Sequence, residues 1–371
     1  MKRILITTGI FPPDIGGPAT FIPSFAEFLS LNKFKVRVIT LSDDSKKEDS
    51  QYPFKVLRIK RIEMRWLRTL ITTTKIAREL RSSDMVFCNG LYLETALSLR
   101  LCNFRGRSLV KIVGDPVWER SQNSNFDRSS IPGKIKFNAL RYFGKIERRL
   151  ITWALEQFDQ VTTPGESLAK EVESWSKRLV VKVVHNGVLI PRENARRTKI
   201  YDLIVVSRLV SWKNVDSVIA ITKELNCSLA IIGDGPKRHA LEMQALGNPR
   251  VTFLGTRASE EIIELLQQSK IFCQLSDYEG LSFSLLQAMA CSIPCLLSDI
   301  TANLDVFDSD HEAAIFVQSR DLQGISKAVS NLLGSPEVQK NLGNRSLEII
   351  RKKFDAEKAM KKMMELMLQY D

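Results

Sequence analysis

Residues 3 to 41 read RILITT (3–8), GIFPPDIGGP (9–18), ATFIPSFAEFLSL (19–31), NKF (32–34) and KVRVITL (35–41). The first and last segments are short apolar runs, which are typical of buried strands, and segment 19–31 has apolar residues at helical spacing. A loop with two adjacent glycines joins the first strand to the helix. This order of strand, loop, helix and strand predicts a βαβ unit, and therefore a parallel sheet covered by helices.

The same alternation continues along the chain. It predicts strands at 54–59, 85–88, 109–113, 160–163 and 180–184, and again at 203–206, 228–232, 251–254, 271–275 and 295–297. Helical periodicity follows at 320–333, 337–353 and 356–367, and the polar stretch 191–198 reads as a linker. Since 371 residues exceed what one hydrophobic core usually serves, we expect two doubly wound α/β domains. We place them at 1–194 and 195–354, facing each other across a cleft, with a helix at 355–371 that packs back toward the first domain.

Charge is distributed unevenly between the two halves. Residues 1–200 contain 36 Lys and Arg against 20 acidic residues, whereas residues 201–371 contain 18 against 22. Two segments are especially basic: 58–81 with eight basic and two acidic residues, and 128–150 with seven and one. A basic first half suits an anionic membrane surface, a phosphorylated acceptor or nucleic acid, and equally a solvated basic surface. No known DNA- or RNA-binding module is present, so we do not expect a nucleic-acid partner.

Cysteines and histidines argue against a disulfide or metal framework. The six cysteines lie mainly in apolar runs without CxxC spacing, which favours buried thiols in a reducing compartment. The three histidines are scattered, and Asp308-Ser309-Asp310 follows no convincing apolar strand, so no metal is expected. The first residues lack the pattern of a signal peptide. We expect a cytoplasmic protein, or one on the cytosolic face of a membrane.

Two basic residues follow the strand at 203–206. Arg208 and Lys213 stand at the entrance of the next helix, where both can reach one diphosphate. They could also be two solvated residues of a loop. Gly233 ends the strand at 228–232 in a glycine-flanked turn, which we interpret as a chain reversal close to the ligand.

The segment from Ser276 to Ala290 is the strongest functional signal. Glu279 can accept hydrogen bonds from sugar hydroxyls, and the amides from Gly280, Leu281 and Ser282 to Phe283 would form a helix N-terminus suited to phosphate. Gln287 follows Glu279 by eight positions, which would place it two turns down on the same side, able to hold a ribose. This interpretation outweighs a plain surface turn.

The first domain contributes two further candidates. Gly16 and Gly17 let backbone amides approach a ligand phosphate or sugar, although a tight structural turn would explain them too. Asp115 follows the strand at 109–113 and could either orient a sugar hydroxyl or cap its loop.

Together these residues resemble the retaining glycosyltransferases of family 4, which have the GT-B fold of two facing Rossmann-like domains. The resemblance covers nearly the whole chain and rests on the Pro-Pro-x-x-Gly-Gly loop, Asn186-Gly187-Val188, Arg208 with Lys213, Gly233-Asp234-Gly235-Pro236, and the segment 276–290. It implies that Arg208 and Lys213 hold the donor diphosphate, that Glu279 meets the donor sugar, and that position 287 meets the ribose. Two departures stand out. Gln287 replaces the second Glu of the family's Glu-x7-Glu pattern, and Gly114-Asp115 stands where many members have a His.

The resemblance implies metal-independent transfer of a hexose from a nucleotide diphosphate sugar, without a cofactor. The basic segment 128–150 has apolar residues at helical spacing, which would suit an anionic membrane and a glycan or polyprenyl-diphosphate-linked acceptor, in cell-surface polysaccharide synthesis. The same apolar stripe would also let the helix cover its sheet. Two alternatives share the architecture. One is a relative that binds the donor but is catalytically weak or silent, and Gln287 keeps this alternative open. The other is a sugar-nucleotide epimerase.

Overall fold

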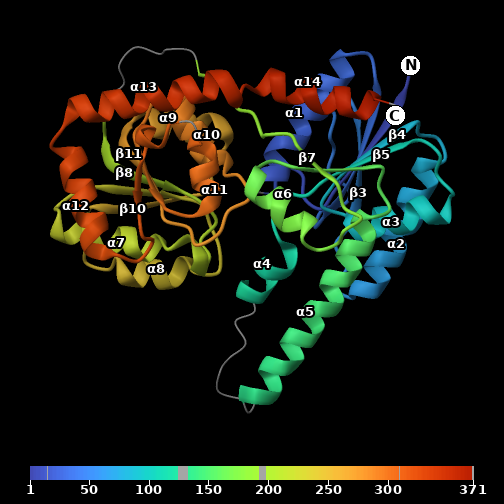
Figure 1. The fold of residues 1–371 in the computed structure, drawn as a ribbon, viewed down its shortest axis with the longest axis horizontal. Coiled ribbons are helices and arrows are strands. Elements are labelled where there is room, and N and C mark those ends of the chain that lie inside the picture. The colour runs from blue at the N-terminus through green and yellow to red at the C-terminus, as the bar shows by residue number, and fades with distance from the viewer. Residues whose placement is uncertain (15, 124–132, 192–197, 309, 370–371) are drawn as a thin grey trace. The chain divides into compact units, whose positions relative to one another are not determined.

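The computed structural model describes residues 1–14, 16–123, 133–191, 198–308 and 310–369, with the side chains of 123–143 left out of the description. The chain forms two units (Figure 1). The first comprises Met1–Val184 and Met360–Asp371, and the second comprises His185–Ala359.

The first unit is built on a parallel sheet of seven strands in the order β3-β2-β1-β4-β5-β6-β7. The strand order reverses between β1 and β4, and such a switch point, at the carboxyl ends of the strands, is where ligands bind in open α/β sheets. The strands are β1 (Arg3–Thr8), β2 (Lys35–Ser42), β3 (Lys55–Lys60), β4 (Met85–Asn89), β5 (Arg107–Lys111), β6 (Gln160–Thr163) and β7 (Val181–Val183). The helices are α1 (Gly17–Leu31), α2 (Arg65–Leu80), α3 (Tyr92–Leu101), α4 (Pro116–Asn123), α5 (Gly133–Leu155) and α6 (Glu166–Glu173).

The second unit repeats this plan with six parallel strands in the order β10-β9-β8-β11-β12-β13. Alternate residues of β8 enter different cores: Leu203 and Val205 pack in one, Ile204 and Val206 in the other. The sheet is therefore buried on both faces, which explains its continuous apolar strands. The strands are β8 (Tyr201–Val206), β9 (Leu229–Ile232), β10 (Val251–Gly255), β11 (Ser269–Gln274), β12 (Cys295–Ser298) and β13 (Ile315–Val317). The α-helices are α7 (Val215–Glu224), α8 (Arg238–Gln244), α9 (Ser259–Gln267), α10 (Phe283–Ala290), α11 (Thr301–Leu304), α12 (Leu322–Leu333) and α13 (Pro336–Lys353), and the 3-10 turns are η1 (Ser211–Lys213), η2 (Asp305–Phe307) and η3 (His311–Ala313).

The division between the units falls after Val184, ten residues before the boundary expected at 194. The physical reason is an isolated β-bridge inside the second unit: the amide of Val188 donates to Phe354 O at 2.9 Å, and Val188 pairs with Asp355. The expected linker at 191–198 lies outside the described residues except for 191 and 198. The last helix, α14 (Ala356–Leu368), starts in the second unit, and residues from Met360 onward belong to the first.

The predicted α/β class with two parallel sheets is confirmed. The strand that was not predicted is β13 (Ile315–Val317), which has only three residues and follows a 3-10 turn, too short a run to give a periodic signal. β5 begins and ends two residues earlier than expected, at Arg107–Lys111.

The cysteines of the chain are free thiols. Burial raises the pKa of Cys88 and of Cys227 to about 11, so both stay protonated at neutral pH. Within the described ranges, no helix combines the length and the apolar character needed to span a bilayer.

Candidate active site

The main candidate residues lie at the carboxyl ends of two neighbouring strands. β8 and β11 pair in parallel, with Leu203 opposite Ile271. Because the carboxyl ends of parallel strands meet at one edge of a sheet, the loops that follow them are neighbours. The loop after β8 carries Arg208 and Lys213, and the loop after β11 carries Ser276 and Glu279.

Glu279 is the centre of this group. Its Oε1 accepts a hydrogen bond from Lys213 Nζ at 2.5 Å and another from Ser276 Oγ at 2.7 Å. The side chains of Lys213 and Glu279 are 16% and 10% exposed, so the ion pair is largely removed from water, where it is less screened than a surface pair. The structure thus brings together a cation, a carboxylate and a hydroxyl that lie up to 66 residues apart in the sequence.

Asn214 locks this arrangement in place. The residue is buried, and its backbone adopts the left-handed helical conformation, with φ at 45°, which asparagine tolerates well. Its amide Nδ2 donates to Leu275 O at 2.8 Å and to Asp277 Oδ1 at 2.7 Å. The amide of Asp277 in turn donates to Trp212 O at 2.8 Å. Bonds on both sides of Lys213 therefore hold η1 against the loop that carries Glu279.

Sequence reasoning missed Asn214. Its position directly before a helix, where asparagine often breaks the regular backbone, was the available signal.

Arg208 is exposed, and its guanidinium lies over the ring of Trp212, 5.9 Å from the centroid. The residue before it, Ser207, is in close contact with Gly233: a Cβ on Gly233 would come within 1.9 Å of Ser207 O. With φ at 130°, Gly233 also adopts a backbone conformation that other residues rarely reach. The glycine turn after β9 thus supports the backbone that presents Arg208.

The helix after Glu279 begins later than predicted. α10 starts at Phe283, and Ser282 is its N-cap, accepting a hydrogen bond from the amide of Leu285 at 3.3 Å. Gly280 and Leu281 therefore belong to the preceding loop, and the amides of 280–282 do not form the helix N-terminus that we expected. The first residue of a helix is difficult to predict from sequence because capping residues resemble loop residues.

Gln287 lies on α10 and donates from Nε2 to Ser259 Oγ, the first residue of α9, at 3.0 Å. Because Glu279 precedes the helix, the eight-residue spacing does not correspond to two helical turns. The structure joins Gln287 to Ser259 and Glu279 to Lys213, in two separate contacts.

In the first unit, Gly16 and Gly17 occupy the start of α1. Gly16 precedes the helix with φ at 148°, and Gly17 is its first residue. The loop before them is braced by arginines from β3 and its end. Arg58 donates to Pro12 O at 2.7 Å, and Arg61 pairs with Asp14.

Asp115 caps α4. Its Oδ1 accepts from the amides of Val117 at 2.9 Å and Trp118 at 3.1 Å, and its other oxygen pairs with Arg148. Of the two roles considered for Asp115, the structure displays the cap. The residue is 3% exposed.

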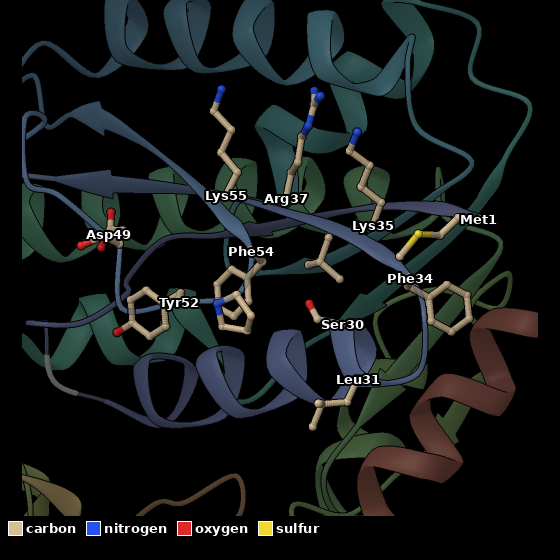
Figure 2. A pocket seen from close by; sticks show the side chains of 13 residues that line it. Met1, Ser30, Leu31, Phe34, Lys35, Arg37, Asp49, Tyr52, Phe54 and Lys55 are labelled. Carbon is tan, nitrogen blue, oxygen red and sulfur yellow. The ribbon is translucent and has the colours of Figure 1, made fainter.

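A cavity of about 810 Å³ lies elsewhere in the first unit (Figure 2). It is lined by Lys35 and Lys55, the first residues of β2 and β3, and by Leu31 at the end of α1. Figure 2 shows Lys35, Arg37 and Lys55 side by side, pointing away from Leu31. The cavity is thus at the amino ends of the strands, the edge opposite the Gly16 loop, and contains none of the predicted site residues.

The acidic pair at 308 and 310 is engaged in ion pairs. Asp308 binds Lys353 at 3.0 Å, and Asp310 binds Arg345. In the described part of the chain, no group of three or more His, Cys, Asp or Glu side chains could hold a metal ion.

Two Rossmann-like units, each built on a parallel sheet, are the architecture of the GT-B fold. Residues 189–348 match the model of the family described as Glycosyl transferases group 1. Among solved structures, sucrose-phosphate synthase from Thermosynechococcus elongatus superposes with a TM-score of 0.81 at 17% identity, covering 99% of this chain and 98% of that one. The protein Alr3699/HepE of Anabaena, solved in complex with UDP and glucose, gives a TM-score of 0.78 at 16% identity, covering 99% of each chain.

A curated relative is the N-acetyl-alpha-D-glucosaminyl L-malate synthase of Bacillus anthracis, which is 28% identical over 229 residues. The match covers 56% of this chain and 59% of that enzyme, so it spans little more than half of the relative's length. The chain is therefore similar to glycosyltransferases in fold throughout, and to this enzyme in sequence over part of its length.

Proposed function

We propose that this protein is a retaining glycosyltransferase that moves a sugar from a nucleotide diphosphate sugar to a glycan or lipid-linked acceptor. The observation that supports the proposal best is the Lys213–Glu279–Ser276 group beside Arg208 at the carboxyl edge of β8 and β11. Its cations suit a diphosphate, and its carboxylate suits sugar hydroxyls.

In the proposed reaction, the donor diphosphate replaces Glu279 as the ion-pair partner of Lys213 and also binds Arg208. Glu279 is then available to accept a hydrogen bond from a donor sugar hydroxyl. The bond between the anomeric carbon and the diphosphate oxygen breaks, and the acceptor oxygen bonds to that carbon on the same face. The acceptor proton passes to the departing phosphate, whose charge is stabilised by Arg208 and Lys213. The proposed reaction uses no metal.

For the acceptor we propose a glycan or a polyprenyl-diphosphate-linked sugar, in the synthesis of a cell-surface polysaccharide on the cytosolic face of a membrane. The surplus of 36 basic over 20 acidic residues in the first 200 supports a partner with negative charge. The UDP in the Anabaena complex supports a nucleotide diphosphate donor by analogy of fold.

The test is calorimetric titration of UDP, GDP and ADP sugars into the protein and its variants. Arg208→Ala and Lys213→Met should each weaken the productive donor about tenfold or more, since each removes a charge-assisted hydrogen bond. Arg250→Ala and Lys223→Met, at exposed positions of the same unit, are the matched controls. If no nucleotide sugar binds, or if the two pairs of variants behave alike, the proposal fails.

Transfer itself is tested with the donor that binds. NMR of the product should show the anomeric configuration of the donor retained, and added EDTA should leave the rate unchanged. An inverted product or a rate abolished by EDTA would contradict the mechanism.

Binding without turnover would favour the second candidate, a donor-binding relative, which is motivated by Gln287 in place of a carboxylate. Epimerised donor without acceptor would identify an epimerase.

A further inference from the structure

The helix α2 carries apolar side chains that its own fold does not bury. Trp66, Leu70, Thr74 and Arg78 recur every four residues, so they share one side of the helix, and all four are exposed. The exposed fraction is 66% for Trp66 and 54% for Leu70. Met64, directly before the helix, is 51% exposed.

Other residues of α2 anchor the helix. Ile76, Ala77 and Leu80 are at most 3% exposed and pack in the core of the first unit. The helix is therefore stabilised without its outer apolar residues, and these are free to contact something else.

Trp66 differs from the other four tryptophans of the chain. Trp212 is buried and Trp118, Trp153 and Trp175 are partly buried, whereas Trp66 is exposed. An indole beside aliphatic side chains and basic residues is typical of helices that lie in the interface of a bilayer.

The charge around this stripe is predominantly positive. Of the basic residues in 58–81, Arg58 is buried with Asp49 and Arg61 is paired with Asp14 and Asp43. Lys75, Arg78 and Arg81 are exposed, and among the described residues none of the three pairs with a carboxylate.

Of the two acidic residues in the segment, Glu79 is neutralised by Arg37. The other acidic residue of the segment, Glu63, is exposed, and Glu147 of α5 lies 3.8 Å from Arg65. The free charge is thus cationic and spread along a helix, which matches an extended anionic surface better than a single anion.

We propose that α2 is a membrane-docking helix, which lies on a bilayer that contains anionic lipid. Met64, Trp66 and Leu70 enter the interface, while Lys75 and Arg78 contact lipid phosphates. This inference extends the membrane partner of the proposed function to a defined surface, and it does not depend on which sugar is transferred. The second basic segment, 128–150, lies largely outside the described side chains and does not contribute to it.

The experiment is sedimentation of the full chain with vesicles of phosphatidylcholine, alone or mixed with phosphatidylglycerol. The wild-type protein should bind the mixed vesicles more tightly, and added salt should weaken this binding. Trp66→Ala with Leu70→Ala should weaken it about tenfold, because two interfacial side chains are lost. Lys75→Gln with Arg78→Gln should weaken it about fivefold for each charge removed.

Two matched controls come from exposed positions of the second unit. Met243→Ala with Leu246→Ala removes exposed apolar side chains, and Lys340→Gln with Lys352→Gln removes exposed charges. Neither control should change vesicle binding. Tryptophan emission should shift to shorter wavelength on binding, and Trp66→Phe should abolish the shift.

Equal binding to neutral vesicles, equal losses in the controls, or binding without a Trp66 shift would each overturn the proposal. The proposal would also be overturned if these side chains form a dimer interface instead. In that case Trp66→Ala would elute as a smaller particle than the wild-type protein in size-exclusion chromatography. Titration of the nucleotide sugar into the same variants separates the two proposals, since the α2 variants should bind donor normally.

Discussion

Replacement of Gly233 by alanine should destabilise the second unit and disturb the backbone that presents Arg208. A Cβ at this position would lie 1.9 Å from Ser207 O, a backbone atom that cannot rotate away. We expect about 1–3 kcal/mol for the displacement of Ser207. The unfavourable φ of 130° adds about 1–3 kcal/mol, so the free energy of unfolding should fall by about 2–6 kcal/mol in total.

Gly247→Ala is the matched control. Gly247 also has a positive φ, of 78°, but nothing lies within 4 Å of its virtual Cβ. This variant should lose only the backbone contribution, about 1–2 kcal/mol. Equilibrium urea unfolding measures both, and hydrogen exchange of peptides from β8 and β9 locates the loss. Losses within about 0.5 kcal/mol of each other would show that the close contact does not matter and would refute the reasoning.

Three further predictions concern single side chains. Asn214→Gly keeps the left-handed backbone but leaves buried acceptors without their donor, so stability should fall by about 1–3 kcal/mol and donor titrations should show weaker binding; unchanged affinity would argue against the lock on Lys213. Gln287→Glu should preserve or improve donor affinity in the same titration, and a large loss would contradict its assignment to the ribose. Burial lowers the pKa of Lys111 from 10.5 to about 7, so above pH 7 the folded chain holds this amine neutral while the unfolded chain still binds the proton. Stability should therefore rise with pH from about 7 to 10, by up to about 1.4 kcal/mol per pH unit, and Lys111→Met should flatten this slope in urea unfolding where the exposed Lys170→Met does not.

Much of the fold could be predicted because its signals are local and repeated. Strands such as 203–206 and 229–232 are buried on both faces, so their residues form continuous apolar runs. Such a run predicts a strand without any knowledge of the strands that pair with it. β13 was not predicted because a strand of three residues is too short to show an alternating pattern. The unit boundary after Val184 could not be predicted because Val188 pairs with Phe354 in the second unit. A pairing between residues so far apart in the sequence gives no local signal in either segment.

In the candidate site, too, the features with a local sequence signal could be predicted and those set by long-range contacts could not. Strand-to-helix loops could be identified from residue type, and the structure brings Lys213 and Glu279 of two such loops into contact. Which residue holds another in place could not be read from sequence. The acceptors of the Asn214 amide are Leu275 O and Asp277 Oδ1, 61 and 63 residues away, and Asn214 itself has a left-handed backbone. The predicted spacing of two helical turns between Glu279 and Gln287 was wrong for a related reason, because α10 begins only at Phe283.

The ion pair between Lys213 and Glu279 also affects how strongly an anion can bind to Lys213. An ammonium that is only 16% exposed is poorly solvated by water, and Glu279 supplies the compensating charge. Any anion that binds Lys213 therefore exchanges places with a resident carboxylate, and its net affinity is the difference between two interactions. When the anion departs, the carboxylate returns to the ammonium. In the proposed reaction, Glu279 would therefore oppose binding of the donor diphosphate and favour release of the nucleoside diphosphate product.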